Sequence, residues 1–174
     1  MPLLQKKNLG TRITDADVVV GVGPGFTAGL DCHVVVETKR GHNLGRCIWE
    51  GSAFPNTGVP GMIGGYDKER IIRATDDGMF KGQVMIGDLV EKGDLVGYSG
   101  NAPIYAQVGG VVRGLLQDGV AVTKGMKSGD VDPRGNIENC YTISDKAASI
   151  GGGVLEAILS MKKKKRAAVK TEKQ

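Results

Sequence analysis

Apolar runs of strand length, separated by glycine-rich turns, dominate the first third of the chain. Residues 17–22, 32–38 and 47–50 each predict a short strand. The first two runs are almost continuously apolar, which is typical of strands buried on both faces of a sheet. Residues 51–65 hold too many prolines and glycines for a regular element, so we interpret them as a linker or a binding loop.

The middle of the chain contains an internal repeat with an offset of 32 residues. Two copies of such a unit cannot bury their apolar faces alone, so we expect them to pair about a pseudo-twofold axis in a flattened β-sandwich. Nine positions recur as identities, five of them glycines: Ile72/Ile104, Ala74/Ala106, Gly78/Gly110, Gly82/Gly114, Gly87/Gly119, Val90/Val122, Lys92/Lys124, Gly93/Gly125 and Gly97/Gly129.

A spacing of three or four between apolar side chains predicts a C-terminal helical segment within residues 135–161, with Ser144 as its N-cap. Three consecutive glycines, Gly151 to Gly153, interrupt this pattern at a cost of about 1 kcal/mol each relative to alanine. Either the helix breaks there, or close packing against another backbone compensates. We favour close packing.

Charge and composition narrow the function classes. The 174 residues carry a net charge of +4, but residues 162–174 alone hold seven Lys or Arg and one Glu. The rest has 16 basic and 18 acidic side chains, so we expect no nucleic-acid partner and a disordered basic tail over 162–174. Three cysteines and the lack of a long apolar run predict reduced thiols, a cytoplasmic location and no membrane partner. We also expect a homo-oligomer.

A glycine-rich loop after the first strand is the first candidate site. Pro24 inside the loop, and a new strand near residue 32 in place of a long helix, argue against a dinucleotide fingerprint. Successive backbone N–H groups around Gly23 and Gly25, together with the Thr27 hydroxyl, could bind a phosphate or a pterin phosphate. The alternative is a tight turn between two strands.

The second strand begins with Asp31, Cys32 and His33. A Cys32 thiolate could accept sulfur or selenium; Asp31 would raise the pKa of this thiol and a protonated His33 would lower it. The alternative is an inert, buried cysteine. An extended strand would hold His33 and His42 about 30 Å apart, and the cysteine and histidine spacings do not match structural zinc. We therefore predict no metal site.

A cluster of polar side chains surrounds the turn before the third strand. The cluster is compatible with a solvated loop or with recognition of an anionic ligand or partner, because arginine offers paired donors to an acidic group. Trp49 belongs to the same cluster. The predicted ligand-binding residues of the chain are Gly23, Gly25, Thr27, Asp31, Cys32, His33, Arg40, His42, Arg46 and Glu50. The sequence identifies no catalytic residue.

Three segments of the repeat carry a family pattern. Residues 87–94 are Gly-Asp-Leu-Val-Glu-Lys-Gly-Asp, residues 106–112 are Ala-Gln-Val-Gly-Gly-Val-Val, and residues 119–125 are Gly-Val-Ala-Val-Thr-Lys-Gly. This pattern resembles biotinyl/lipoyl-type domains, the barrel-sandwich hybrid, whose carriers attach the cofactor to a lysine at the tip of the hairpin between the copies. Residues 97–103, Gly-Tyr-Ser-Gly-Asn-Ala-Pro, contain no lysine. We therefore expect a non-carrier of biotin or lipoate, in a structural or docking version of the fold.

Longer motifs carry a second resemblance, at residues 7–12, 23–33, 37–46, 49–53 and 132–135; the last is Asp-Pro-Arg-Gly. Across residues 7–160 the chain resembles the YqeB family, accessory proteins of selenium-dependent molybdenum hydroxylase systems. The resemblance implies a role in maturation of such a hydroxylase, but no settled reaction and no known cofactor. Family members usually open with a nucleotide-binding-like half, so the chain resembles their C-terminal portion.

Three functions are compatible with these features. The first is an accessory protein that is not an enzyme, whose partners are a molybdenum hydroxylase or its maturation proteins and a separate nucleotide-binding half. The second is an enzyme that acts on a nucleotide or a pterin through the loop from Gly21 to His33. The third is a structural docking module that binds its partner through the sandwich.

The predicted fold class is α+β and β-dominated, a barrel-sandwich hybrid joined to a small α/β part with a C-terminal helix. The small α/β part covers residues 1–66 and is joined by the helical segment 135–161. The barrel-sandwich hybrid covers residues 67–134. The disordered basic tail covers residues 162–174.

Overall fold

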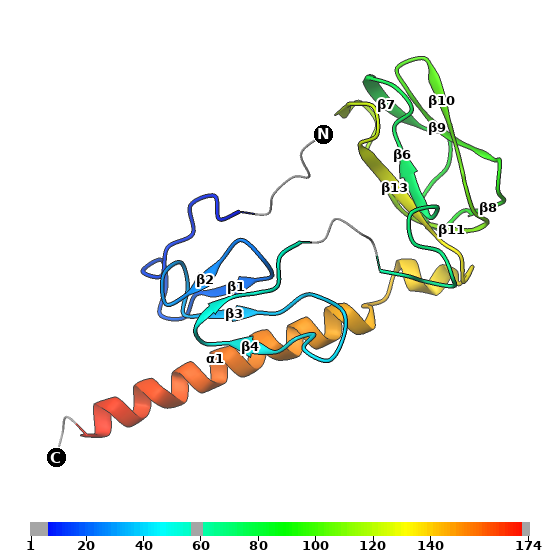
Figure 1. Cartoon of the computed structure of the whole chain (residues 1–174). Coiled ribbons are helices and arrows are strands. Elements are labelled where there is room, and N and C mark those ends of the chain that lie inside the picture. The colour runs from blue at the N-terminus through cyan, green and yellow to red at the C-terminus, as the bar shows by residue number, and fades with distance from the viewer. Residues whose placement is uncertain (1–6, 57–60, 172–174) are drawn as a thin grey trace. The chain divides into compact units, whose positions relative to one another are not determined.

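The computed structural model describes residues 7–56 and 61–171. The chain divides into two compact units, one formed by Met1–Gly58 with Ile143–Gln174 and the other by Val59–Thr142. Short strands and one long C-terminal helix make up the fold (Figure 1). The prediction of a β-dominated α+β protein is thus confirmed. Within the described residues, no helix has the length and apolar character needed to cross a membrane.

The first unit is built around a three-stranded sheet. Strand β1 (Val20–Val22) pairs in parallel with β3 (Val34–Val36), which pairs in antiparallel fashion with β4 (Cys47–Ile48). A separate two-stranded ribbon joins β2 (Thr27–Ala28) to β5 (Gly51–Ser52). The three predicted strands are present but shorter, since residues 17–19, 32–33, 37–38 and 49–50 lie outside β1, β3 and β4.

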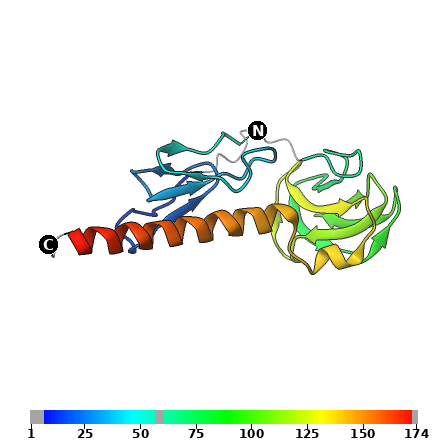
Figure 2. The same ribbon diagram turned by 90° about the horizontal axis from the view of Figure 1, so that it is seen from below.

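Both faces of this sheet are covered, as the continuous apolar runs predict. Val34 packs with Cys47 and Ala157 against the long helix α1 (Asp145–Thr171), which runs along the sheet (Figure 2). Val35 packs on the opposite face, in a cluster that includes Cys32 and Ala28. Residues 34–36 are all fully buried.

Helix α1 begins as the sequence predicts. The Ser144 hydroxyl accepts a hydrogen bond from the Ala147 N–H at 3.2 Å, so Ser144 is the N-cap. The helix then continues without a break to Thr171, beyond the predicted end at residue 161 and through most of the segment predicted to be a disordered tail. Lysine, arginine and alanine are good helix formers, which accounts for this extension. Residues 172–174 lie outside the described residues.

Helix α1 passes through the three glycines without breaking because one of them meets another backbone. A Cβ at Gly153 would lie well inside van der Waals contact with the carbonyl oxygen of Gly45, and 2.9 Å from a methyl group of Val36. A Cβ at Gly151 or Gly152 would meet nothing within 4 Å. The predicted close packing is therefore present, and it needs a glycine at position 153 only.

The second unit contains two four-stranded sheets. One has the order β10-β9-β7-β12 and the other β6-β13-β11-β8. The first copy of the repeat contributes β6 (Ile71–Arg73), β7 (Gly78–Gly82), β8 (Leu89–Val90) and β9 (Leu95–Ser99), and the second contributes β10 (Ala102–Tyr105), β11 (Gly110–Leu115), β12 (Ala121–Val122) and β13 (Lys127–Asp132). A shift of 32 residues exchanges the two sheets strand for strand, so each sheet contains strands of both copies.

Hydrogen bonds outside the strands repeat with the same offset. Ala74 N–H donates to Met126 O and Ala106 N–H donates to Asp94 O, both at 2.9 Å. Gly125 N–H donates to Ala74 O and Gly93 N–H to Ala106 O, both at 2.8 Å. Gly125 and Gly93 have φ of +82° and +99°, a conformation that favours glycine. Both copies of the repeat therefore form the same turn, with the same hydrogen bonds.

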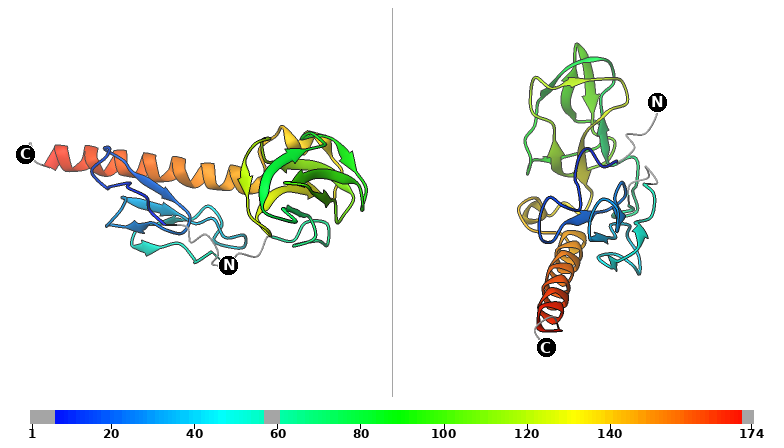
Figure 3. Two further views of the ribbon diagram at one scale, coloured as in Figure 1. Left: turned by 90° about the horizontal axis from the view of Figure 1, so that it is seen from above. Right: turned by 90° about the vertical axis from the view of Figure 1, so that its left-hand side faces the viewer.

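Both sheets contribute to one apolar core, and their strands curl around it (Figure 3). Phe80 from β7, Val96 from β9, Ile104 from β10, Val112 from β11 and Val131 from β13 are at most 1% exposed. Val90 and Val96 also face this core, since their side chains are 6% and 0% exposed. The two copies of the repeat thus pair around a shared core, with strands of both copies in each sheet.

A buried carboxylate ends the second unit's last strand. Asp132 is 1% exposed, and its oxygens accept hydrogen bonds from the Arg134 guanidinium at 2.9 and 2.6 Å. Arg113 lies 3.6 Å away on the same carboxylate. The hydrogen bonds from Arg134 hold the pKa of Asp132 below its usual value, against the opposing effect of burial. This contact explains why Asp and Arg occur together in the 132–135 motif.

We expect Asp132→Asn to lower the free energy of unfolding of the second unit by about 1–3 kcal/mol at pH 7. A carboxyl whose pKa is lower in the folded than in the unfolded state stabilises the fold above its unfolded pKa, and this contribution disappears as the pH falls through the folded pKa. The difference between wild type and variant should therefore shrink as the pH falls below about 4. Denaturant titrations at several pH values measure it, and an equal difference at every pH would contradict the assignment.

Candidate functional site

Hydrogen bonds to Val36 and to the Asp31 carboxylate hold the glycine-rich loop. Gly23 N–H donates to Val36 O at 2.9 Å, and Thr27 N–H donates to the Asp31 carboxylate at 2.8 Å. The other Asp31 oxygen accepts a hydrogen bond from the Asn8 amide at 3.0 Å. Asp31 and Val36 therefore engage the Thr27 and Gly23 N–H groups, which an external phosphate would need, and the tight-turn interpretation accounts for these contacts.

Cys32 and His33 are both engaged inside the first unit. Cys32 is fully buried, and burial raises the pKa of its thiol, with backbone hydrogen bonds acting in the opposite direction and the Asp31 charge adding to the increase. His33 Nδ1 accepts a hydrogen bond from the Val19 N–H at 3.0 Å. The structure therefore favours the inert, buried interpretation of this cysteine.

The remaining predicted residues lie around the turn between β3 and β4. Arg40 donates two hydrogen bonds, of 2.7 and 3.2 Å, to Asp145 at the start of helix α1. His42 is exposed in this turn, and Glu50 is exposed just after β4. Arg46 is different, because it lines a pocket in the first unit.

The pocket has a volume of about 370 Å³, at the small end of the range for ligand sites. Its lining comes from residues 37–54, a single stretch of chain that includes strand β4, which pairs with β3 and contacts helix α1. The lining residues are Glu37, Asn43, Arg46, Cys47, Ile48, Trp49 and Phe54. The structure thus brings Arg46 together with Trp49, as the polar cluster predicts, and adds residues that the sequence did not suggest.

Glu37 organises this pocket and was not among the predicted residues. Its side chain is 1% exposed. One carboxylate oxygen accepts hydrogen bonds from the N–H groups of Thr38 and Lys39, both at 2.7 Å, and the other accepts one from Phe54 N–H at 2.9 Å. The only signal in the sequence is an acidic residue directly after the buried run Val34–Val36. Glu37 thereby ties the loop that carries Phe54 to the end of β3.

Two lysine ammonium groups lie over the aromatic rings that line the pocket. The Lys39 ammonium lies 4.7 Å from the ring centroid of Phe54, and the Lys164 ammonium lies 4.3 Å from that of Trp49. Both contacts have cation–π geometry. With Arg46, three cationic side chains thus line the pocket or lie against its walls.

Cys47 is the pocket's only thiol, and it is not set up as a nucleophile. Its Sγ donates to the Gly153 carbonyl oxygen at 3.1 Å. Burial raises the pKa of the Cys47 thiol, and the charge of Glu156 raises it further. A protonated, hydrogen-bonded thiol beside a fully engaged carboxylate suits ligand binding better than covalent catalysis. Among the described residues, no three His, Cys, Asp or Glu side chains gather as metal ligands.

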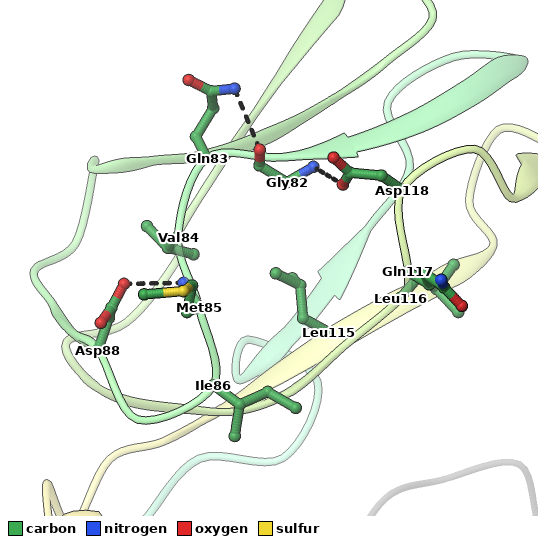
Figure 4. A pocket seen from close by; sticks show the side chains of 10 residues that line it. All are labelled: Gly82, Gln83, Val84, Met85, Ile86, Asp88, Leu115, Leu116, Gln117 and Asp118. Atoms are coloured by element: carbon green, nitrogen blue, oxygen red, sulfur yellow. Dashed lines mark hydrogen bonds between the residues drawn. The ribbon is translucent and has the colours of Figure 1, made fainter.

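The second unit has its own pocket, of about 640 Å³ (Figure 4). Residues 82–86 line one side, and 115–118, which include the repeat equivalents of 83–86, line the other. The pocket therefore lies where equivalent segments of the two copies face each other. Leu115 extends toward the segment that carries Val84 and Met85 (Figure 4). Met85 is 72% exposed and Ile86 43% exposed at its rim.

Comparison with known proteins gives one extensive sequence match. The chain is 52% identical over 159 residues to the uncharacterized protein YqeB of Escherichia coli (strain K12). The match covers 91% of this chain and 29% of that protein, so the chain spans less than a third of its relative. This sequence identity confirms the resemblance to YqeB that the motifs indicate. No family model matches the chain.

Two solved structures overlap parts of the fold. An aspartoacylase family protein from Mesorhizobium loti matches with a TM-score of 0.33 and 20% identity, over 36% of this chain and 22% of that one. The ectoine utilization protein EutE (DoeB) from Ruegeria pomeroyi matches with a TM-score of 0.25 and 24% identity, over 49% of this chain and 26% of that one.

Proposed function

We propose that this chain is a member of the YqeB family and an accessory protein in the maturation of a selenium-dependent molybdenum hydroxylase. The observation that carries the proposal is the 52% identity to YqeB, which extends over 91% of the chain and so includes most of the motifs of the first unit. The accessory role itself comes from the family resemblance. In this role the chain binds a ligand or a partner and catalyses no reaction.

The geometry of the first unit supports binding in preference to catalysis. The pocket around Trp49 offers aromatic walls and cations. Its thiol and its carboxylate are both occupied by hydrogen bonds to the backbone. The rival function, an enzyme acting through the loop from Gly21 to His33, would need donors that Val36 and Asp31 already engage.

The barrel-sandwich hybrid is our proposal for the fold class of the second unit. The exchange of strands between two sheets related by the 32-residue offset supports it. The hairpin between the copies turns at Gly100 and Asn101, between β9 and β10, and it carries no lysine. The unit is accordingly a non-carrier of biotin or lipoate.

The proposed partners are the hydroxylase itself or its maturation proteins, together with a separate nucleotide-binding half. A cytoplasmic location and a homo-oligomeric state complete the proposal. The 29% coverage of YqeB is compatible with such a half, since most of that relative lies outside the match.

The second unit supports one further candidate function, that of a docking module. Its pocket joins an apolar rim, with exposed Met85 and Ile86, to the carboxylates of Asp88 and Asp118. This combination suits a partner segment that carries apolar side chains next to lysine or arginine.

Deletion of the coding sequence for this chain, in a host that makes the hydroxylase, tests the proposed function. We expect hydroxylase activity to fall to background while the hydroxylase polypeptide is still made, because the accessory step precedes an active enzyme. Expression of the intact chain from a plasmid should restore activity. Wild-type activity in the deletion strain would refute the accessory role.

A further inference from the structure

We propose that the pocket around Trp49 binds a small planar molecule that carries an acidic group, either a phosphate or a carboxylate. This inference rests on the proposed function, because it names the ligand class of the same binding protein. It follows from three features of the pocket: two aromatic walls, three cations in or beside it, and a carboxylate whose two oxygens both accept backbone hydrogen bonds.

The aromatic walls favour a flat ligand. Trp49 directly follows strand β4 and Phe54 lies two residues after β5, and both side chains line the same pocket. Phe54 is 51% exposed although it is large and apolar. Its backbone N–H donates to Glu37, so the backbone that carries the exposed ring is held in position. Fixed, accessible aromatic rings are the surfaces on which planar ligands stack.

The cations favour an acidic group on that ligand. Lys39 lies over Phe54 and Lys164 lies over Trp49, so each wall has an ammonium group beside it. Arg46 donates to Asn43 at 3.3 Å, and among the described residues its guanidinium has no acidic partner. Arginine offers five N–H donors in a fork that matches a carboxylate or a phosphate.

Glu37 does not reverse this preference. Its two oxygens accept three backbone N–H bonds, so both oxygens are already engaged inside the protein. A cationic ligand would have to compete with these hydrogen bonds and approach three like charges. An acidic ligand meets three opposite charges and leaves Glu37 in place.

Trp49 is the only tryptophan of the chain, so its fluorescence reports on this pocket directly. The full chain is titrated with nicotinate, nicotinamide and N-methylnicotinamide, which share one ring and differ in charge. Guanosine 5′-monophosphate and guanosine form a second pair, and inorganic phosphate alone supplies charge without a ring. We expect saturable changes with nicotinate or the nucleotide, with binding about tenfold tighter than that of the uncharged counterparts.

Matched arginine variants locate the acidic group. Arg46→Gln should weaken binding of the acidic probe about tenfold, whereas Arg40→Gln should leave it unchanged because Arg40 pairs with Asp145 away from the pocket. Equal binding of charged and neutral rings, tighter binding of N-methylnicotinamide, or no saturable response to either acidic ring at millimolar concentration would each overturn the ligand class. The proposed function would still stand in those cases if deletion of the chain abolishes hydroxylase activity.

Discussion

Replacing Gly153 by alanine is expected to destabilise the first unit by about 2–3 kcal/mol, a typical cost of forcing atoms into a packed site. The new methyl group would overlap the Gly45 carbonyl oxygen and press on Val36. Because backbone cannot move aside as a flexible side chain can, either helix α1 or the turn at Gly45 has to shift. That turn leads into Arg46 and the pocket, so the shift should also change the fluorescence of Trp49.

Gly152→Ala is the matched control. It lies one residue away in the same helix, and its Cβ would meet nothing within 4 Å. Removing a glycine from a helix interior should stabilise the unit by about 0.5–1 kcal/mol. Thermal unfolding followed by circular dichroism compares the two variants, with a difference of roughly 10 °C or more expected between them. Similar melting temperatures would mean that helix α1 does not pack on Gly45.

Glu37→Ala is expected to cost about 2–4 kcal/mol, because three backbone N–H groups lose their acceptor together. The loop that carries Phe54 would lose its tie to the end of β3. Glu37→Gln should fall between wild type and alanine, since an amide keeps one acceptor oxygen and loses the other. Denaturant unfolding gives the stability, and hydrogen exchange at the Phe54 amide reports on the loop itself.

Glu50→Ala provides the comparison for this prediction. Glu50 belongs to the same segment but is exposed, so its removal should change stability by less than about 0.5 kcal/mol. If Glu37→Ala were as stable as Glu50→Ala, the buried carboxylate would not hold the pocket together.

The repeat was predictable from sequence because its signals are local and occur twice. Glycines such as Gly93 and Gly125 mark turns that need a positive φ, and each recurs 32 residues later. Val90 and Val96 flank the exposed turn at Gly93, and both are buried in the core. The N-cap at Ser144 and the close packing at Gly153 were predictable for another reason, since both follow from the cost of forming a helix.

The pocket was harder to predict because long-range contacts decide it. Arg40 and Arg46 look alike in sequence, but Asp145, 105 residues away from Arg40, pairs with only one of them. The sequence predicts only that Asp31 raises the pKa of the Cys32 thiol, yet Asp31 also accepts hydrogen bonds from Thr27 and from Asn8. The roles of Glu37 and Phe54 depend on how the loop after β5 folds back, which periodicity does not encode.

The central claim is that the pocket of the first unit carries the function, while the repeat unit supports it. Complementation of the deletion strain by two single variants tests this most directly, with hydroxylase activity as the measurement. Trp49→Ala removes a pocket wall in the first unit, and Met85→Glu places a charge on the exposed rim of the second unit's pocket. We predict that the Met85 variant, expressed as a folded protein at wild-type level, restores activity and that the Trp49 variant does not. Restoration by the Trp49 variant, with loss in the Met85 variant, would contradict the claim and favour the docking function.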